Sequence, residues 1–307
     1  MDELSHRLGS TELKLSAATA IGPAHGPAGL PNQDAYDLIS GDGFLVLAVA
    51  DGAGSLARSD EGSELAVEVG AGMAADLYLA ARRDGAEPEL PKILAQSILE
   101  ARSTVFTLDF WREAGSTLVL ALLTENSFAV ASVGDSFAVV QTAAGELKLV
   151  QPPAAGEFAN ITKLLTSDGI ITSICGGKLT ALSGLALCSD AFEHATLEQR
   201  IPTAGFWSTV FPMARGGKLK AEELIRFMDS QGKIDDDATL IALATDGTEA
   251  PALDSLWERD YSFEELQELA GIEPASDHGS EAPEEVADWR SGWDGPDSGP
   301  RGLPTAF

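Results

Sequence analysis

Residues 44–55 read FLVLAVADGAGS, an apolar run followed by an aspartate and two glycines. The apolar run over residues 44–50 is too short for a typical helix and predicts a buried strand. Asp51 follows where the chain turns, and Gly52 and Gly54 carry no side chain that would obstruct an approaching ligand. A carboxylate at the end of a buried strand, beside glycines, favours a metal site at Asp51.

The composition is that of an acidic globular protein. Its 307 residues are 44% hydrophobic, which is enough to build a core for one large domain or two small ones. The formal charge is -28, from 48 acidic and 20 basic residues, and such a surface would repel nucleic-acid phosphates. Acidity favours cations and basic partners, although most of these charges serve solubility. We therefore expect no nucleic-acid partner.

Targeting signals are not evident in the sequence. The N-terminal residues, MDELSHRLGS, lack the basic and apolar regions of a signal peptide, and no apolar run approaches the roughly 20 residues that span a bilayer. Cys175 and Cys188 lack the paired spacing of a zinc site or a disulfide framework and are expected to be buried thiols. We expect a cytoplasmic protein with no membrane partner.

Hydrophobic patterns before residue 116 predict strands followed by two long helices. The expected strands cover residues 11–22, 36–39 and 44–50, and the expected helices cover residues 59–83 and about 89–110. The last two strands should form a hairpin that brings Asp34 close to Asp51. The buried stripe of the first helix is expected at Leu65, Val69, Met73 and Leu77.

From residue 116 the pattern returns to short strands joined by tight turns, which predicts an antiparallel sheet. The expected strands cover residues 117–123, 128–133, 137–141, 146–150, 184–188 and 238–244. Gly-rich residues 151–183 are typical of a flap over a site. A helix is expected to about Arg200, then an aromatic loop over 206–217 and a helix over 219–230.

The composition changes after about Thr245, where Pro, Gly, Ser, Asp and Glu dominate. This change predicts a catalytic domain over residues 1–248 and an acidic, mostly flexible C-terminal extension over residues 249–307. Trp289 and Trp293 lie in this extension and either anchor it on the domain or a partner, or stay unattached.

Aspartates recur at strand ends and turns along the whole chain. The set comprises Asp34, Asp51, Asp135, Asp190, Asp236 and Asp237. One such acid alone is typical of a cap or a turn, but a gathered set would repel itself unless cations occupied the site. Because oxygen ligands select Mg²⁺ or Mn²⁺ over zinc, the repeated pattern favours a centre for one of these ions.

Six short motifs in a fixed order carry a family resemblance. They are NQDA (32–35), VADGAGS (49–55), GSTL (115–118), VGDS (133–136), CSDAF (188–192) and DDATL (236–240). Over about residues 11–245 the chain resembles the metal-dependent type 2C protein serine/threonine phosphatases. The loop HGPAGLPNQDA, which begins at His25, is similar to a bacterial branch of that family.

The resemblance implies an α+β fold, an α-β-β-α sandwich of two antiparallel sheets flanked by helix pairs. It also implies two or three Mg²⁺ or Mn²⁺ ions, with Asp51 bridging two of them and the carbonyl of Gly52 binding one. The remaining implied ligands are Asp190 and Asp236 at the first ion, Asp34 at the second, directly or through water, and Asp135 with Asp190 at a weaker third. The implied reaction is attack of a metal-activated water on phosphoserine or phosphothreonine in a phosphoprotein made by a cognate Ser/Thr kinase in bacterial signalling.

Two departures from the family pattern concern phosphate and metal. Gly29 stands where the resemblance implies a phosphate-binding arginine, so His25 either binds phosphate, protonates the leaving group or is a surface loop histidine. Asp237 replaces the usual asparagine and either tightens metal binding or replaces a hydrogen bond. Two alternative functions remain, a catalytically weak regulatory or phosphoprotein-binding module and a hydrolase of small phosphate esters.

Overall fold

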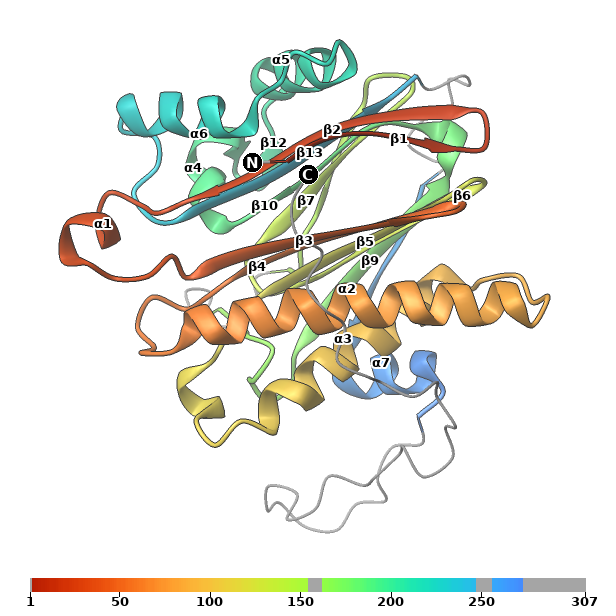
Figure 1. The fold of residues 1–307 in the computed structure, drawn as a ribbon, viewed down its shortest axis with the longest axis horizontal. Helices are drawn as coiled ribbons and strands as arrows, with labels where there is room; N and C mark the ends of the chain where they lie inside the picture. The colour runs from red at the N-terminus through yellow and green to blue at the C-terminus, as the bar shows by residue number, and fades with distance from the viewer. Residues whose placement is uncertain (1, 154–161, 247–255, 273–307) are drawn as a thin grey trace. The chain divides into compact units, whose positions relative to one another are not determined.

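The computed structural model describes residues 2–153, 162–246 and 256–272, which form two stacked antiparallel sheets (Figure 1). The first six-stranded sheet has the order β1-β2-β13-β10-β7-β8. Its strands are β1 (Asp2–Leu8), β2 (Thr11–Ala20), β7 (Phe137–Thr142), β8 (Leu147–Val150), β10 (Leu182–Cys188) and β13 (Ala238–Thr245).

The second six-stranded sheet has the order β14-β9-β6-β5-β4-β3, and its neighbouring strands also run antiparallel. Its strands are β3 (Asp34–Gly41), β4 (Phe44–Asp51), β5 (Leu118–Thr124), β6 (Ser127–Val133), β9 (Ile171–Lys178) and β14 (Trp257–Ser262). The two sheets face each other, and side chains from both fill the layer between them.

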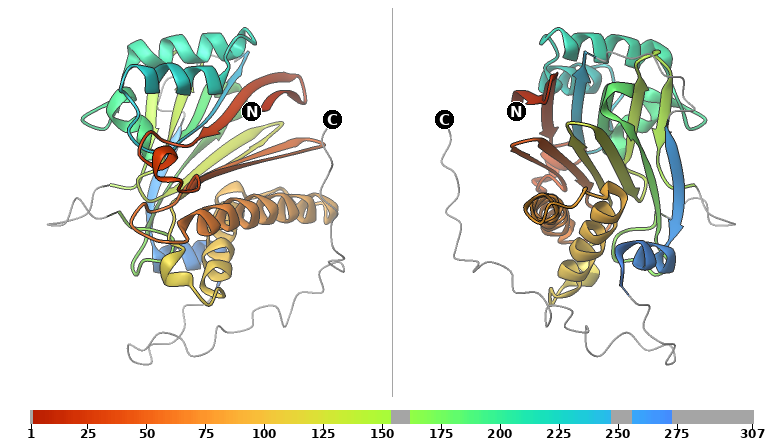
Figure 2. Two further views of the ribbon diagram at one scale, coloured as in Figure 1. Left: turned by 60° about the vertical axis from the view of Figure 1, so that its left-hand side comes forward. Right: turned by 90° about the vertical axis from the view of Figure 1, so that its right-hand side faces the viewer.

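Helices cover the outer face of each sheet (Figures 1 and 2). Helices α5 (Ala204–Arg215) and α6 (Ala221–Ser230) pack on the first sheet, and α2 (Ser59–Arg83), α3 (Leu90–Phe106) and α7 (Phe263–Ala270) pack on the second. The predicted α-β-β-α sandwich is therefore confirmed. Within the described residues, no helix is long and apolar enough to cross a membrane.

Strand β4 is buried on both faces, which explains why residues 44–50 are apolar without alternation. Leu45 and Leu47 belong to the core between the sheets, whereas Val46 and Ala48 pack toward α2 and α3. The predicted hairpin with β3 is confirmed, and Asp34 pairs directly with Asp51 in its register. The hairpin thus places two carboxylates at one end of the sandwich.

Helix α2 begins and ends at the predicted residues, but the predicted buried stripe is wrong. Its buried face consists mainly of small residues, including Gly62, Ala66, Gly70 and Ala74. The expected residues Leu65, Val69, Met73 and Leu77 are only partly buried. Small side chains allow the helix axis to approach the sheet closely, since a Cβ on Gly70 would already lie 3.2 Å from a methyl group of Leu120.

Residues 189–217 differ most from expectation. The helix expected to reach Arg200 is wrong, because the chain forms a 3-10 turn (Asp190–Phe192), α4 (Glu193–Thr196) and then a small hairpin of β11 (Leu197–Glu198) and β12 (Ile201–Pro202). The loop expected over 206–217 is mostly α5. Gly205 and Pro212 lower the helix propensity of that segment, but burial of Trp207 and Phe211 outweighs them.

Strands β1, β9 and β14 are not predicted by the sequence patterns. Strand β14 pairs with β9, and α7 packs against α3, so both elements beyond residue 248 complete the second sheet and its helical cover. The predicted domain boundary at residue 248 stays a prediction. In the structure, β14 and α7 lie beyond this residue. Trp289, Trp293 and the remainder of the expected extension from residue 273 lie outside the described residues.

Two glycines in α2 allow a matched test of the close helix–sheet approach. A Cβ at Gly62 would lie 2.0 Å from the carbonyl oxygen of Ala114, whereas a Cβ at Gly72 would meet nothing within 4 Å. We expect Gly62→Ala to lower the free energy of unfolding by about 1–3 kcal/mol through overpacking. Gly72→Ala should raise it by about 0.5–1 kcal/mol through reduced chain entropy in the unfolded state. Urea denaturation measures both, and equal stability of the two variants would contradict this packing.

Candidate metal centre

Three aspartates from separate segments meet at one end of the sandwich. Asp51 ends β4, Asp135 lies in the turn between β6 and β7, and Asp190 follows β10. One carboxylate oxygen from each lies within 4.8 Å of the others. Because β4 belongs to the second sheet and β10 to the first, the cluster forms only when the two sheets stack.

Asp34 joins this cluster through its pairing with Asp51. Its side chain is buried near the hydroxyl groups of Ser189 and Thr239, which favour its ionised form, yet its Oδ2 atom has no partner among the described residues. A buried acceptor without a donor is costly. This orphaned oxygen fits a cation or a cation-bound water.

The aspartates of the cluster resist ionisation. Burial raises the pKa of Asp34 to about 7 and that of Asp190 to about 6, and neighbouring carboxylates contribute in both cases. Burial, together with the charges of Asp34 and Asp190, raises the pKa of Asp51 well above its usual value. The raised pKa values reflect the cost of placing several negative charges close together and away from water. A divalent cation bound there would stabilise the ionised carboxylates.

Gly52 holds Asp51 in place through backbone contacts. Its N–H donates to the carbonyl of Gln33 at 3.0 Å, and it forms an isolated bridge with Ser116. A Cβ at Gly52 would lie 2.6 Å from the Gln33 oxygen and 2.7 Å from the Ser59 oxygen, so only glycine fits. The metal-binding role of the Gly52 carbonyl stays a prediction.

Two hydroxyl groups connect Asp51 to the turn that carries Asp135. The backbone N–H of Asp51 donates to Thr117 Oγ1 at 2.9 Å, and Thr117 Oγ1 lies 2.7 Å from Ser136 Oγ. Both residues fall within the GSTL and VGDS motifs, but nothing in their spacing reveals that they contact each other. Sequence reasoning therefore missed this link.

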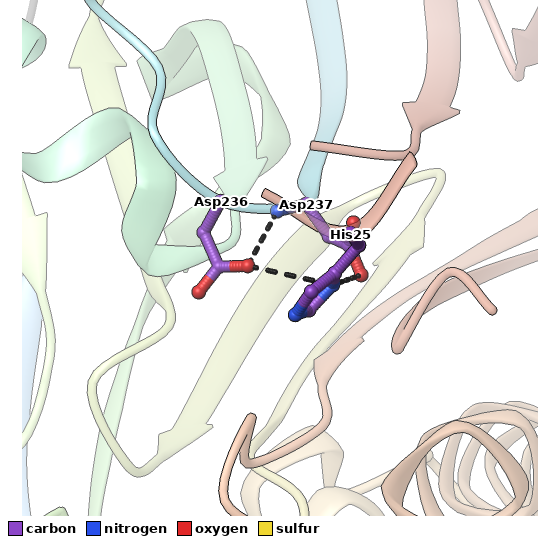
Figure 3. Close-up of side chains that lie close together, drawn as sticks. All are labelled: His25, Asp236 and Asp237. Carbon is purple, nitrogen blue, oxygen red and sulfur yellow. Dashed lines mark hydrogen bonds and ion pairs between the residues drawn. The ribbon is translucent and has the colours of Figure 1, made fainter. Parts of the chain in front are cut away.

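Asp236 and Asp237 lie in a second group with His25 (Figure 3). Asp237 is almost fully buried, and its Oδ1 accepts from the N–H of Gly22 at 2.6 Å. Its Oδ2 accepts from the N–H of Gln33 at 2.7 Å and from His25 Nδ1 at 2.8 Å. Both oxygens are thus engaged in tethering the segment 22–33 to β13. The metal role expected for Asp237 stays a prediction that these contacts disfavour, while they support the hydrogen-bonding role.

Asp236 is exposed and points differently from its neighbour. Its Oδ1 accepts from the backbone N–H of Asp237 at 2.8 Å and lies 3.7 Å from His25 Nδ1. It does not belong to the close group formed by the three cluster aspartates, although its charge contributes to the raised pKa of Asp190. The structure therefore places Asp236 at the edge of the cluster.

His25 opens the short helix α1 (His25–Ala28) and is buried, so its interpretation as a surface loop histidine is wrong. The hydrogen bond to Asp237 raises the pKa of His25, and burial offsets part of this effect. Gly29 ends α1 with φ 68°, a left-handed conformation that favours glycine over arginine. This backbone conformation explains why Gly29 stands where the resemblance implies an arginine.

The residues of the cluster fit a divalent cation. The candidate ligands are all oxygens, the carboxylates are crowded, and one buried oxygen lacks a donor. The buried thiols Cys175 and Cys188 lie in the strands β9 and β10 and are absent from both groups of candidate ligands. An oxygen-only donor set favours Mg²⁺ or Mn²⁺ over softer metals.

The fold and this cluster define an α-β-β-α sandwich with a candidate metal centre at one end. The chain belongs to the protein phosphatase 2C family, whose model it matches over residues 21–289. It is 30% identical over 172 residues to serine/threonine-protein phosphatase 3 of Escherichia coli (strain K12). That alignment covers 52% of this chain and 66% of the relative, so the chain spans just under two thirds of the relative's length.

Two solved structures share the fold. A bacterial serine phosphatase is 16% identical with a TM-score of 0.51, and the match covers 80% of this chain and 100% of that one. The catalytic domain of the serine/threonine phosphatase PstP, in complex with two manganese ions, is 16% identical with a TM-score of 0.51. That match covers 77% of this chain and 99% of the other. At such identities the likeness concerns the fold alone.

The raised pKa values predict how the stability of the metal-free protein depends on pH. The folded carboxyls bind protons more tightly than unfolded ones, so folding is destabilised progressively as pH rises from about 4 to about 7. We expect a lower Tm at about pH 8 than at about pH 5.5, and Mn²⁺ should reverse the loss at the higher pH.

Asp34→Asn should flatten this pH dependence and raise the Tm of the metal-free protein at high pH, because it removes a buried charge. Asp84→Asn, which neutralises an exposed carboxylate at the end of α2, provides the control for net charge. Thermal unfolding with and without chelator measures these effects. A metal-free Tm that is independent of pH, or equal responses of the two variants, would contradict the assignment.

Proposed function

We propose that this protein hydrolyses phosphoserine and phosphothreonine in phosphoproteins by a metal-dependent reaction. The cluster of Asp51, Asp135 and Asp190 is the observation that carries the proposal, because partly buried carboxylates this close together repel one another unless cations neutralise them. Membership of the protein phosphatase 2C family and the similarity to the Escherichia coli relative support phosphate-ester chemistry.

The proposed centre holds two or three Mg²⁺ or Mn²⁺ ions. Asp51 would bridge two ions and the carbonyl of Gly52 would bind one of them, and Asp190 with Asp236 would complete the first site. Asp34 would support the second, and Asp135 with Asp190 would form the third. When bound, such ions lower the pKa of a water molecule, offset the negative charge of a phosphate group and so supply the nucleophile for hydrolysis.

The chain's own residues prepare this chemistry by fixing the positions of the carboxylates. The Thr117 hydroxyl fixes the backbone of Asp51, and the hydroxyl groups of Ser189 and Thr239 lie near the side chain of Asp34 and favour its ionised form. Positions fixed before substrate arrives need no reorganisation during the reaction. The sandwich would thus present preorganised carboxylate oxygens to the ions.

His25 is the proposed contact for phosphate or for the leaving group. Because Asp237 accepts from Nδ1, the Nε2 atom is the ring nitrogen that remains for substrate (Figure 3). The raised pKa of His25 increases the fraction of imidazolium, which carries a proton on Nε2. A proton at that atom can stabilise a phosphate oxygen or protonate the departing serine or threonine oxygen.

The proposed biological setting is cytoplasmic bacterial signalling in which a cognate Ser/Thr kinase makes the substrate. Two other functions use the same site, a weak module that binds phosphoproteins and a hydrolase of small phosphate esters. Turnover of a phosphopeptide panel, compared with small phosphate esters, separates the three. A preference for phosphopeptides by kcat/KM supports the proposal.

Asp190→Ala should abolish Mn²⁺-dependent hydrolysis of phosphopeptides and of an aryl phosphate, because it removes a ligand shared by two proposed ions. The fold should persist, because burial makes the charged Asp190 side chain unfavourable in the folded state and the substitution removes that charge. Asp84→Ala should retain full activity. Steady-state kinetics with circular dichroism test this, and full activity of Asp190→Ala would show that the site is misassigned.

Replacing His25 distinguishes its two proposed roles. If His25 protonates the leaving group, His25→Ala should lower kcat on phosphopeptides by about 10²-fold or more and change little on aryl phosphates, whose leaving group needs no proton. If His25 binds phosphate, both substrates should lose activity together, mainly through KM. Unchanged rates on both across the pH range would remove His25 from the mechanism.

A further inference from the structure

The hairpin of β11 and β12 turns through two residues with unfavourable backbone conformations. Gln199 has φ 50° and Arg200 has φ 62°, and they are the only non-glycine residues with positive φ in the described parts of the chain. Tight two-residue turns of this kind normally use Asn-Gly or similar pairs. Two large side chains are therefore kept here at a cost in backbone strain, and such strain concentrates at functional positions.

The side chain of Arg200 is held against the chain segment that follows β8. Its Nη2 atom donates to the carbonyl of Pro152 at 2.7 Å and to the carbonyl of Gln151 at 3.2 Å. Among the ion pairs of the described residues, none involves Arg200, although the protein carries 48 acidic residues. The guanidinium thus binds two neutral carbonyls and fixes the peptide between them.

Gln151 links that fixed peptide to the metal centre. Its side chain is buried, and its Nε2 donates to the backbone carbonyl of Asp135. The hydroxyl of Thr162 donates to Oδ2 of the same aspartate. Asp135 is therefore held through its backbone by Gln151 and through its carboxylate by Thr162, and Arg200 holds Gln151.

We propose that Arg200 is a positioning residue for Asp135, acting through the carbonyls of residues 151 and 152 and the amide of Gln151. The strained turn directs the guanidinium toward these carbonyls. Without it, the backbone at Gln151 gains rotational freedom, the contact to the Asp135 carbonyl weakens, and the carboxylate of Asp135 loses its fixed place beside Asp51 and Asp190. Cation binding at Asp135 should weaken as a result. This inference rests on the proposed function only in taking Asp135 as a metal ligand.

The two strained residues provide a matched pair of variants. Arg200→Gly and Gln199→Gly each place a glycine at one left-handed position and so remove the backbone strain there. Both variants should therefore unfold at the same or a higher temperature than the wild type. Only Arg200→Gly loses the guanidinium. We expect it to weaken the weakest Mn²⁺ site about tenfold, whereas Gln199→Gly should bind Mn²⁺ as the wild type does.

Isothermal titration calorimetry of the full-length protein with Mn²⁺ alone measures this binding without reference to catalysis. Arg200→Lys should also weaken it, because an ammonium cannot reproduce the planar donor geometry. In an Asp135→Asn background, Arg200→Gly should cause no further loss, since the pathway through Asp135 is already interrupted. An effect of Arg200 on Mn²⁺ binding that does not act through Asp135 would give equal additional losses in both backgrounds.

Identical Mn²⁺ affinities in Arg200→Gly and Gln199→Gly would overturn the inference, and so would a large drop in Tm in Arg200→Gly alone. Failure of the proposed function would give a different experimental result. A wild-type protein that binds Mn²⁺ but hydrolyses no phosphopeptide would refute the activity, while a selective loss of Mn²⁺ affinity in Arg200→Gly would still support the positioning role.

Discussion

Carboxylates that repel one another are gathered at one end of the sandwich, and the fold must keep them together. Asp34 and Asp51 are brought together by strand pairing, and Asp190 arrives from the opposite sheet. The apolar core between the sheets forces this arrangement although the charges oppose it. The fold therefore holds the acids close together at an electrostatic cost that a divalent cation would offset.

The surrounding hydrogen bonds determine which carboxylates remain available for that cation. Asp237 uses both oxygens to tether the segment from Gly22 to Gln33, whereas Asp34 keeps one oxygen without a donor. The same tether fixes His25 beside the cluster. Two adjacent aspartates in the sequence thus have different tasks, since Asp236 remains exposed at the edge of the cluster and Asp237 supports the loop.

Sequence alone predicts the parts of the fold in which local pattern and burial agree. The apolar run of β4, its hairpin with β3 and the length of α2 follow from hydrophobic periodicity and turn residues. The buried face of α2 does not follow from periodicity. Close packing on the sheet requires small residues such as Gly70 on that face, and Leu65 lies beside it. Helix α5 is missed for a related reason, since burial of its aromatic residues outweighs the low helix propensity of Gly205 and Pro212. At the site, the aspartates follow from their repeated position at strand ends and turns. The roles of Thr117, Gln151 and Arg200 depend on contacts between distant segments.

The fold gathers carboxylate oxygens around Asp51, and we propose that they hold divalent cations. Anomalous diffraction from crystals soaked in Mn²⁺ tests it most directly, because it locates each ion without reference to activity. Peaks are expected within coordination distance of Asp51 and Asp190, at about 2.0–2.2 Å from their oxygens. An absence of peaks at this cluster, or a single peak at His25 and Asp237 instead, would contradict it.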